Sequence, residues 1–329
     1  MKISHQVLSM LLVMSMVPAV LSKPASAEAI EPGDGGDGDY RTFYSNGKIE
    51  QGKIGDSYTA DLVVYLAGNQ FMAVEELTKS FLKKNPDIKT VFVETIPPGQ
   101  ILSDQLLKQG EINGQKIAMN PDVYGSVDVS HLKKLKSVGK MDQYQTYTHN
   151  KLELMVAAGN PKGIKSVEDL KRDDLVQSHP NPINEGIFKF YGSEMLKDLG
   201  LYDKVTGGKE CKGCWAVANK TWFTERHHRE TPARLEKGEA DVGIVWATEV
   251  AHAKATGRKV EGVAISSPLN KQDKAGYVIG ASKDGRNAKN AAAFLAYLAT
   301  DEAQAVYAKY GFAKASADEL KAKAIPDAK

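Results

Sequence analysis

Short apolar runs, bounded by polar or turn-forming residues, recur along the chain. In the clearest of them, residues 242–246 (VGIVW) follow the polar segment 238–241, and polarity returns at Thr248 and Glu249. A run of this length that is rich in Val and Ile is typical of a strand buried on both faces of a parallel sheet. Similar runs predict further strands at residues 62–67, 90–94, 122–126 and 152–158.

Periodic apolar positions predict helices between these strands. Phe71, Val74, Leu77 and Phe81 fall on one helical face, and the Asn85-Pro86 pair ends that helix. Further helices are predicted after residues 97–100, after a capping box at residues 166–169, at residues 291–299 and from Thr300 to a stop at Gly311. The alternation of strand, helix and strand predicts an α/β fold built on a parallel sheet.

Polar residues follow several of the predicted strands. In open α/β sheets a ligand binds just beyond the carboxyl ends of the strands. Trp246, Thr248 and Glu249 are therefore expected at the mouth of a cleft, and Asn69 and Gln100 lie at strand-to-helix turns, where loops carry function. Asn69 has a second interpretation, as the N-cap of its own helix, and both roles can coexist at one helix end.

The first 57 residues carry no sign of a folded domain. Lys2, an apolar run over residues 7–21 and an Ala-Ser-Ala site at 25–27 predict a cleavable secretory signal over residues 1–27. The run is too short to span a membrane, and no cysteine follows it to carry a lipid anchor. The mature protein is expected in the periplasm. Residues 28–57, which contain a Gly/Asp tract, are expected to form a disordered linker.

The charge balance argues against nucleic-acid and membrane-surface binding. The chain has 43 Lys and Arg against 41 Asp and Glu, and loss of residues 1–27 removes Lys2 and Lys23, which leaves 41 basic residues. A nucleic-acid partner would require a basic face. A neutral protein can still bind an anion if backbone N–H groups and helix ends provide the donors.

The pair Cys211 and Cys214 allows several interpretations. Haem attachment is excluded because Trp215 replaces the required histidine. Three interpretations stay open: zinc binding with His227, a thioredoxin-like redox site, and a disulfide that closes a surface loop in an oxidising compartment. We favour the disulfide, and we expect neither a metal nor a cofactor.

A second polar cluster, HHRETP at residues 227–232, predicts a helix start with Thr231 as N-cap and Pro232 in the first turn. His228 and Arg229 would then stand before a helix N-terminus and could bind an anion, or they could belong to a solvated charged loop. No serine-nucleophile elbow, His-Glu metalloprotease spacing or phosphate loop occurs, so an enzyme is not expected.

Several segments, in order and spacing, resemble those of a known family. The chain is similar to the periplasmic molybdate- and tungstate-type solute-binding proteins of ABC importers, which have the type II periplasmic binding protein fold. The matching segments are residues 64–77, 98–106, 122–126, 147–161, 186–196, 238–250 and 292–312.

This resemblance implies two Rossmann-like α/β lobes joined by two crossovers, with the ligand held between them by helix N-termini. Residues 58–146 and 271–329 would form lobe 1 and residues 147–270 lobe 2, with hinges near residues 146 and 270. By position, Asn69 stands where the family has a ligand-binding serine, and Trp246 stands where it has a tyrosine. The other positions carried over as ligand contacts are Gly99, Gln100, Asn184, Gly186, Thr248 and Glu249.

The resemblance further implies a monomeric receptor that delivers a small anion, such as a molybdate- or tungstate-like oxyanion, to an ABC permease. Asn69 and Gln100 replace hydroxyls by amides, which also donate hydrogen bonds. A carboxylate beside an anion is repulsive, so Glu249 is expected to brace a neighbour. The alternatives are a ligand sensor for a signalling partner, and a redox or metal protein that uses Cys211, Cys214, His227 and His228.

Overall fold

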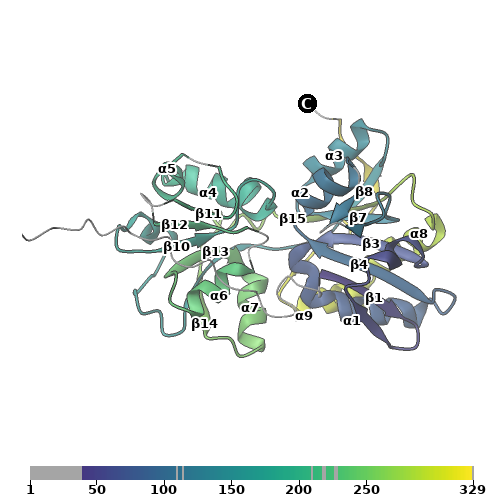
Figure 1. Cartoon of the computed structure of the whole chain (residues 1–329), viewed down its shortest axis with the longest axis horizontal. Helices are drawn as coiled ribbons and strands as arrows, with labels where there is room; N and C mark the ends of the chain where they lie inside the picture. The colour runs from purple at the N-terminus through teal and green to yellow at the C-terminus, as the bar shows by residue number, and fades with distance from the viewer. Residues whose placement is uncertain are drawn as a thin grey trace, which may run out of the picture.

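The computed structural model describes residues 39–108, 110–112, 115–208, 210–216, 220–225 and 229–327. The predicted signal at residues 1–27, the first part of the predicted linker, and His227 and His228 lie outside these residues. Within the described ranges, the two large sheets each form the centre of one lobe, and the lobes lie side by side (Figure 1). No helix in this part of the chain is long and apolar enough to cross a membrane.

Lobe 1 is built on a mixed sheet with the strand order β16-β8-β15-β7-β3-β4-β1-β2, and β17 also pairs with β8. Its strands are β1 (Tyr40–Tyr44), β2 (Ile49–Gln51), β3 (Leu62–Ala67), β4 (Thr90–Ile96), β7 (Val123–Ser126), β8 (Gln143–His149), β15 (Gly276–Ala281), β16 (Ala313–Lys314) and β17 (Lys323–Ala324), and a separate ribbon pairs β5 (Glu111–Ile112) with β6 (Gln115–Lys116). Its helices are η2 (Ile54–Tyr58), η3 (Gly68–Gln70), α1 (Phe71–Lys84), α2 (Pro98–Gln100), the π-helix η4 (Ile101–Leu106), α3 (Val129–Ser137), α8 (Ala288–Leu298) and α9 (Asp301–Lys309).

Lobe 2 has the strand order β11-β12-β10-β13-β9-β14. Its strands are β9 (Leu152–Ala157), β10 (Gln177–His179), β11 (Cys214–Ala216), β12 (Thr221–Phe223), β13 (Val242–Trp246) and β14 (Val260–Ala264). Its helices are η5 (Val167–Lys171), the π-helix η6 (Ile187–Gly192), α4 (Ser193–Asp198), α5 (Tyr202–Thr206), α6 (Glu230–Glu236) and α7 (Ala247–Ala255).

Parallel pairing is present only in part. β3 lies parallel to β4 and β7, and β10 lies parallel to β12 and β13. The strands β1, β9, β14 and β15 pair antiparallel with their neighbours. The prediction of an α/β fold is confirmed, but both sheets are mixed, because each receives a strand from the chain as it crosses between the lobes.

The chain crosses between the lobes twice. The first crossover joins β8 to β9 through Asn150 and Lys151, and the second covers residues 265–275 between β14 and β15. The two crossovers contact each other, since the Asn150 N–H donates to the Ala275 carbonyl at 3.1 Å. The boundary expected at residues 146–147 falls inside β8, whereas the one expected at 270–271 falls within the second crossover.

The prediction of a disordered linker over residues 28–57 is wrong from Asp39 onwards. β1 extends the lobe 1 sheet by pairing antiparallel with β4, and β2 closes a hairpin on β1. The Gly/Asp tract preceding this segment suggested a linker, but Tyr40 and Phe43 are buried in the core. Their apolar side chains provide the burial that keeps the hairpin in place.

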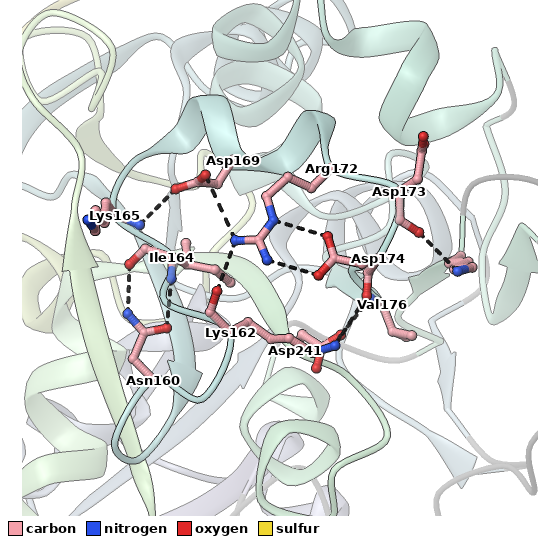
Figure 2. Close-up of polar contacts among 11 residues, drawn as sticks. Asn160, Lys162, Ile164, Lys165, Asp169, Arg172, Asp173, Asp174, Val176 and Asp241 are labelled. Carbon is pink, nitrogen blue, oxygen red and sulfur yellow. Dashed lines mark hydrogen bonds and ion pairs between the residues drawn. The ribbon is translucent and has the colours of Figure 1, made fainter.

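A polar network fixes the long loop that connects β9 to β10 in lobe 2 (Figure 2). Arg172 binds both carboxylate oxygens of Asp174, at 3.1 and 2.9 Å, and donates to the Lys162 carbonyl at 2.9 Å. The Val176 N–H donates to Asp241 at 2.8 Å, which ties the start of β10 to β13. The predicted capping box at Ser166 is present, although the helix it opens is a short 3-10 turn.

Candidate functional site

The carboxyl ends of the parallel strands in lobe 1 face lobe 2, and the two backbones approach closely there. An added Cβ at Gly99 would lie 2.7 Å from the Asn184 carbonyl oxygen, and one at Gly186 would overlap the Val127 side chain. The Tyr191 hydroxyl of lobe 2 donates to the Val127 carbonyl of lobe 1. The structure therefore has the lobes in contact, with Gly99 and Gly186 at positions where a side chain would push them apart.

A buried polar chain links the two lobes beside the crossovers. Asn69 Nδ2, at the end of β3, donates to the Tyr277 hydroxyl at 2.6 Å, and Asn150 Nδ2 donates to the same hydroxyl at 3.3 Å. Asn150 Nδ2 also donates to Thr248 Oγ1 at 3.0 Å. The Trp246 ring, at the end of β13, packs 5.8 Å from the ring of Tyr277. Predicted site residues from both lobes thus meet at the crossover.

Several buried polar atoms at the ends of β3 and β4 have no hydrogen-bond partner in the part of the chain that the structure describes. They are Asn69 Oδ1, both ends of the Gln70 amide, and Thr95 Oγ1, and Asn184 Oδ1 of lobe 2 shares this property. Buried polar groups are nearly always hydrogen-bonded, so each exception calls for a physical explanation. A polar guest between the lobes would provide one.

Arg229 crosses from lobe 2 to lobe 1. Its Nη2 donates to Asp39 Oδ1 at 2.6 Å and to the Thr95 carbonyl at 3.3 Å, and its guanidinium lies 4.6 Å from the centre of the Phe71 ring. Phe71 opens α1, a helix of 14 residues whose N-terminus carries a partial positive charge. Burial lowers the pKa of neighbouring Arg41 to about 10, so that guanidinium also stays cationic at neutral pH.

Glu94 is an acid in the core of lobe 1, one residue before Thr95. Its side chain is fully buried, and Gln105 Nε2 donates to Oε1 at 2.6 Å, while Oε2 meets no donor from the described residues. Burial raises the pKa of Glu94 to about 8, and the Gln105 bond opposes that shift, whereas the charge of Asp39 adds to it. Glu94 is therefore predominantly neutral at pH 7.

A cavity of about 450 Å³ opens between the lobes on the side of α2 and α3. Gly99 and Asn184 line it together with the basic side chains of Lys134, Lys189 and Lys212, and Asp104 is the acid in its lining. Its volume is in the range of small-molecule sites, about 300–1,000 Å³. An anion would meet a favourable potential at this entrance.

The structure brings most of the predicted site residues to the interface between the lobes: Asn69, Gly99, Asn184, Gly186, Arg229, Trp246 and Thr248. Gln100 is half-buried one residue beyond Gly99 and does not line the cavity. Glu249 is buried near Tyr277, where burial raises the tyrosine pKa and the charge of Glu249 adds to the shift. His228 lies outside the described residues.

The helix after Arg229 starts earlier than predicted. α6 begins at Glu230 with Arg229 as its N-cap, so the prediction of Thr231 in that position is wrong. The Thr231 hydroxyl instead lies 3.1 Å from the Ser178 hydroxyl, within the lobe 2 core. Because its hydroxyl faces the core, the Thr231 side chain does not cap the helix.

Cys211 and Cys214 are joined by a disulfide, with their Cα atoms 6.1 Å apart. Among the residues that the structure describes, no group of three His, Cys, Asp or Glu side chains is arranged to hold a metal ion.

Glu185 stabilises the loop that carries Asn184. Its carboxylate accepts from the Asn181 N–H at 3.1 Å and from the Thr224 hydroxyl, which fixes the loop that carries Asn184.

Sequence reasoning missed several residues of this interface, namely Asp39, Gln70, Thr95, Asn150 and Tyr277. Gln70 is adjacent to Asn69, and Thr95 directly follows the strand predicted at residues 90–94, so the rule that singled out Asn69 could have found both. Asp39 lay in the tract interpreted as a linker. Asn150 and Tyr277 give no local signal, because their role depends on a contact between distant segments.

Comparison with known proteins agrees with this architecture. The sequence model of a family described as bacterial extracellular solute-binding protein matches residues 62–313. A Bacillus subtilis protein described as an ABC transporter substrate-binding lipoprotein is 26% identical over 259 residues, which are 76% of this chain and 85% of its own. The sulfate-binding protein of Synechococcus elongatus is 30% identical over 170 residues, which are 50% of this chain and 47% of its own.

Among solved structures, the periplasmic molybdate-binding protein of Azotobacter vinelandii superimposes with a TM-score of 0.59 at 19% identity, over 78% of this chain and 100% of its own. The chain thus shares the type II periplasmic binding protein fold, with two lobes and two crossovers.

Proposed function

Since the chain belongs to the bacterial extracellular solute-binding proteins, we propose that it is a periplasmic receptor which binds a small oxyanion between its lobes and delivers it to an ABC importer. The relatives named above support this proposal, because two of them are described as ABC-type or sulfate-binding proteins and the solved structure is a molybdate-binding protein. The names of these relatives support a tetrahedral oxyanion as the ligand class, with sulfate and molybdate as its known examples among them.

The observation that carries the proposal is the buried amide of Gln70 at the start of α1, which has no hydrogen-bond partner among the described residues. The next residue, Phe71, has the Arg229 guanidinium of the opposite lobe against its ring. A helix N-terminus, a side-chain amide and a guanidinium provide three kinds of donor for an oxyanion. They come from both lobes, so a guest at this position would hold the lobes together.

Binding would couple to closure. With the lobes apart, the anion would meet the end of β3 and the N-terminus of α1 in lobe 1. Lobe 2 would then bring Asn184, Arg229 and Trp246 against it by rotation about the crossovers at residues 150–151 and 265–275. The ligand shifts the population toward the closed form because it gains contacts with both lobes only there.

An oxyanion of the right kind is expected to stabilise the protein against heat. A ligand at 100 times its Kd adds about 2.7 kcal/mol to the free energy of unfolding. With an entropy of unfolding of about 2.1 cal/mol/K per residue, this raises the melting temperature of a chain of this size by roughly 4–5 °C. The melting temperature of the mature chain would be measured with molybdate, tungstate, sulfate, phosphate, arsenate and small organic acids. Arg229→Gln should abolish the shift. Arg172→Gln, whose side chain bonds within the loop between β9 and β10, should retain it. No shift with any of these anions would contradict the proposal.

A double variant separates the receptor proposal from the alternative of a redox or metal protein, and the values that follow are those expected for a receptor. Replacing Cys211 and Cys214 together by serine should cost about 2 kcal/mol or less in the free energy of unfolding, because a disulfide stabilises a short loop little. Anion binding should stay within about threefold of wild type. Urea denaturation, calorimetry and metal analysis check these values. Stoichiometric zinc in the wild type, or loss of anion binding in the double variant, would favour the alternative.

A further inference from the structure

Asp39 lies at the interface between the lobes although it precedes the part of the chain that matches the family. The match begins at residue 62, whereas Asp39 directly precedes β1. Its neighbour Tyr40 pairs with Glu94 of β4, so Asp39 lies near the carboxyl end of β4. It is 1% exposed, and its partner Arg229, from lobe 2, is 3% exposed. A segment outside the family match thus contributes a buried carboxylate to the interface.

The hydrogen-bonding capacity of Asp39 is only half used. Arg229 donates to Oδ1, whereas Oδ2 is buried and has no partner among the residues that the structure describes. A carboxylate oxygen can accept a hydrogen bond but cannot donate one. Leaving such an oxygen buried without a donor is costly, so a guest that provides a donor gains more than one that does not.

The atoms around Asp39 favour the same kind of guest. Within the described ranges, the Thr95 hydroxyl and both ends of the Gln70 amide have no partner. The hydroxyl and the amide oxygen can accept a hydrogen from a guest, and the amide nitrogen can donate one to it. The positive charges nearby are those of Arg229 and Arg41, which also interact electrostatically with Asp39 and with each other. The region therefore attracts an anion, but it also places a carboxylate against that anion.

Oxyanions differ in whether they can satisfy such a carboxylate. At neutral pH, sulfate and molybdate carry no hydrogen. If either anion bound here, its oxygen next to Asp39 would be repelled by the negative charge of the carboxylate. Phosphate and arsenate keep at least one hydroxyl hydrogen, which can be donated to the carboxylate. Discrimination against a competitor through an unpaired charge is an effective way to gain specificity.

We propose that Asp39 makes the cleft select oxyacids that retain a hydroxyl hydrogen, such as hydrogen phosphate or hydrogen arsenate, over fully deprotonated tetraoxoanions. This proposal rests on the function proposed above and narrows its ligand class. Asp39 Oδ2 accepts the hydroxyl hydrogen of the guest, while Arg229 binds Oδ1 and holds the carboxylate in place.

The test is the ratio of two affinities, measured by isothermal titration calorimetry at pH 7 on the mature full-length chain. Wild type should bind phosphate at least about 100-fold more tightly than sulfate or molybdate. Asp39→Asn, which replaces an acceptor by a donor-bearing amide of the same shape, should reduce that ratio to less than about tenfold. Asp87→Asn, in an exposed loop of lobe 1, is the matched control and should keep the wild-type ratio.

Far-UV circular dichroism and the melting temperature without ligand establish that the Asp39→Asn protein is folded, and the ratio is insensitive to a uniform loss of affinity. Asp39→Ser, which removes the charge and the side-chain length, should likewise lower the ratio. Equal affinity of wild type for phosphate and sulfate, or an unchanged ratio in both variants, would overturn the role of Asp39 and leave the receptor function intact. Absence of binding by every anion would overturn both.

Discussion

Replacing Gly99 by alanine is expected to weaken ligand binding by roughly 5- to 100-fold without unfolding the protein. The added Cβ would meet the carbonyl oxygen of Asn184 at 2.7 Å and its Cα at 3.2 Å. These are backbone atoms of the opposite lobe, so they cannot turn away as the end of a side chain could. Overpacking of this kind costs about 1–3 kcal/mol, and each 1.4 kcal/mol is tenfold in affinity.

The Gly99→Ala substitution should weaken closure of the two lobes without straining the backbone of lobe 1, because the backbone angles of Gly99 are ones that alanine can adopt. Calorimetry with the anion that binds wild type gives the affinity, and small-angle X-ray scattering should show that the liganded variant closes less completely than wild type. Gly55→Ala, where an added Cβ meets open space, is the matched control. Wild-type affinity in Gly99→Ala would show that the two lobes do not need this contact in the bound state.

Replacing Glu94 by glutamine is expected to make the protein more stable at high pH, by roughly 3–5 kcal/mol in the free energy of unfolding at pH 8 and above. The pKa of Glu94 is raised from 4.5 to about 8, chiefly by burial. The folded state therefore keeps a proton that the unfolded state loses in this window. In wild type, the contribution of Glu94 to the free energy of unfolding is fully present below about pH 4.5. It is lost as the pH rises to about 8, at about 1.4 kcal/mol per pH unit.

The measurement is urea denaturation of wild type and Glu94→Gln at several pH values between 4 and 9. The two proteins should differ little near pH 4, since glutamine keeps an acceptor for Gln105, and the difference should grow through the window. Glu111→Gln, at an exposed position, should follow wild type throughout. A difference between the Glu94 variant and wild type that does not change with pH would mean that this acid is not held neutral.

The sequence alone was sufficient for the elements whose signal is local. The apolar run at residues 242–246 is a fully buried strand, and the periodic face of Phe71, Val74, Leu77 and Phe81 lies on α1. Thr300 caps α9 by accepting from the Ala303 N–H. In each case a few neighbouring residues determine the structure, through burial or capping, so the pattern is visible without knowledge of the fold.

What depends on distant contacts was not predicted. Asp39 appeared to belong to a Gly/Asp linker, because only its pairing partners in β4 and Arg229 of lobe 2 give it a place. The chain of bonds from Asn69 through Tyr277 to Asn150 joins residues about 130 to 210 positions apart. The neutral state of Glu94 likewise comes from burial under η4, which no local pattern shows.

One small oxyanion is expected to bind between the lobes, at the ends of β3 and β4. A crystal structure of the protein soaked or co-crystallised with the anion that most stabilises it would show the position of that anion. We expect a single anion in contact with the Gln70 amide and the start of α1 on one side and with Arg229 and Asn184 on the other. An anion bound only on the outer surface of one lobe, with Gln70 and Arg229 untouched, would refute binding between the lobes.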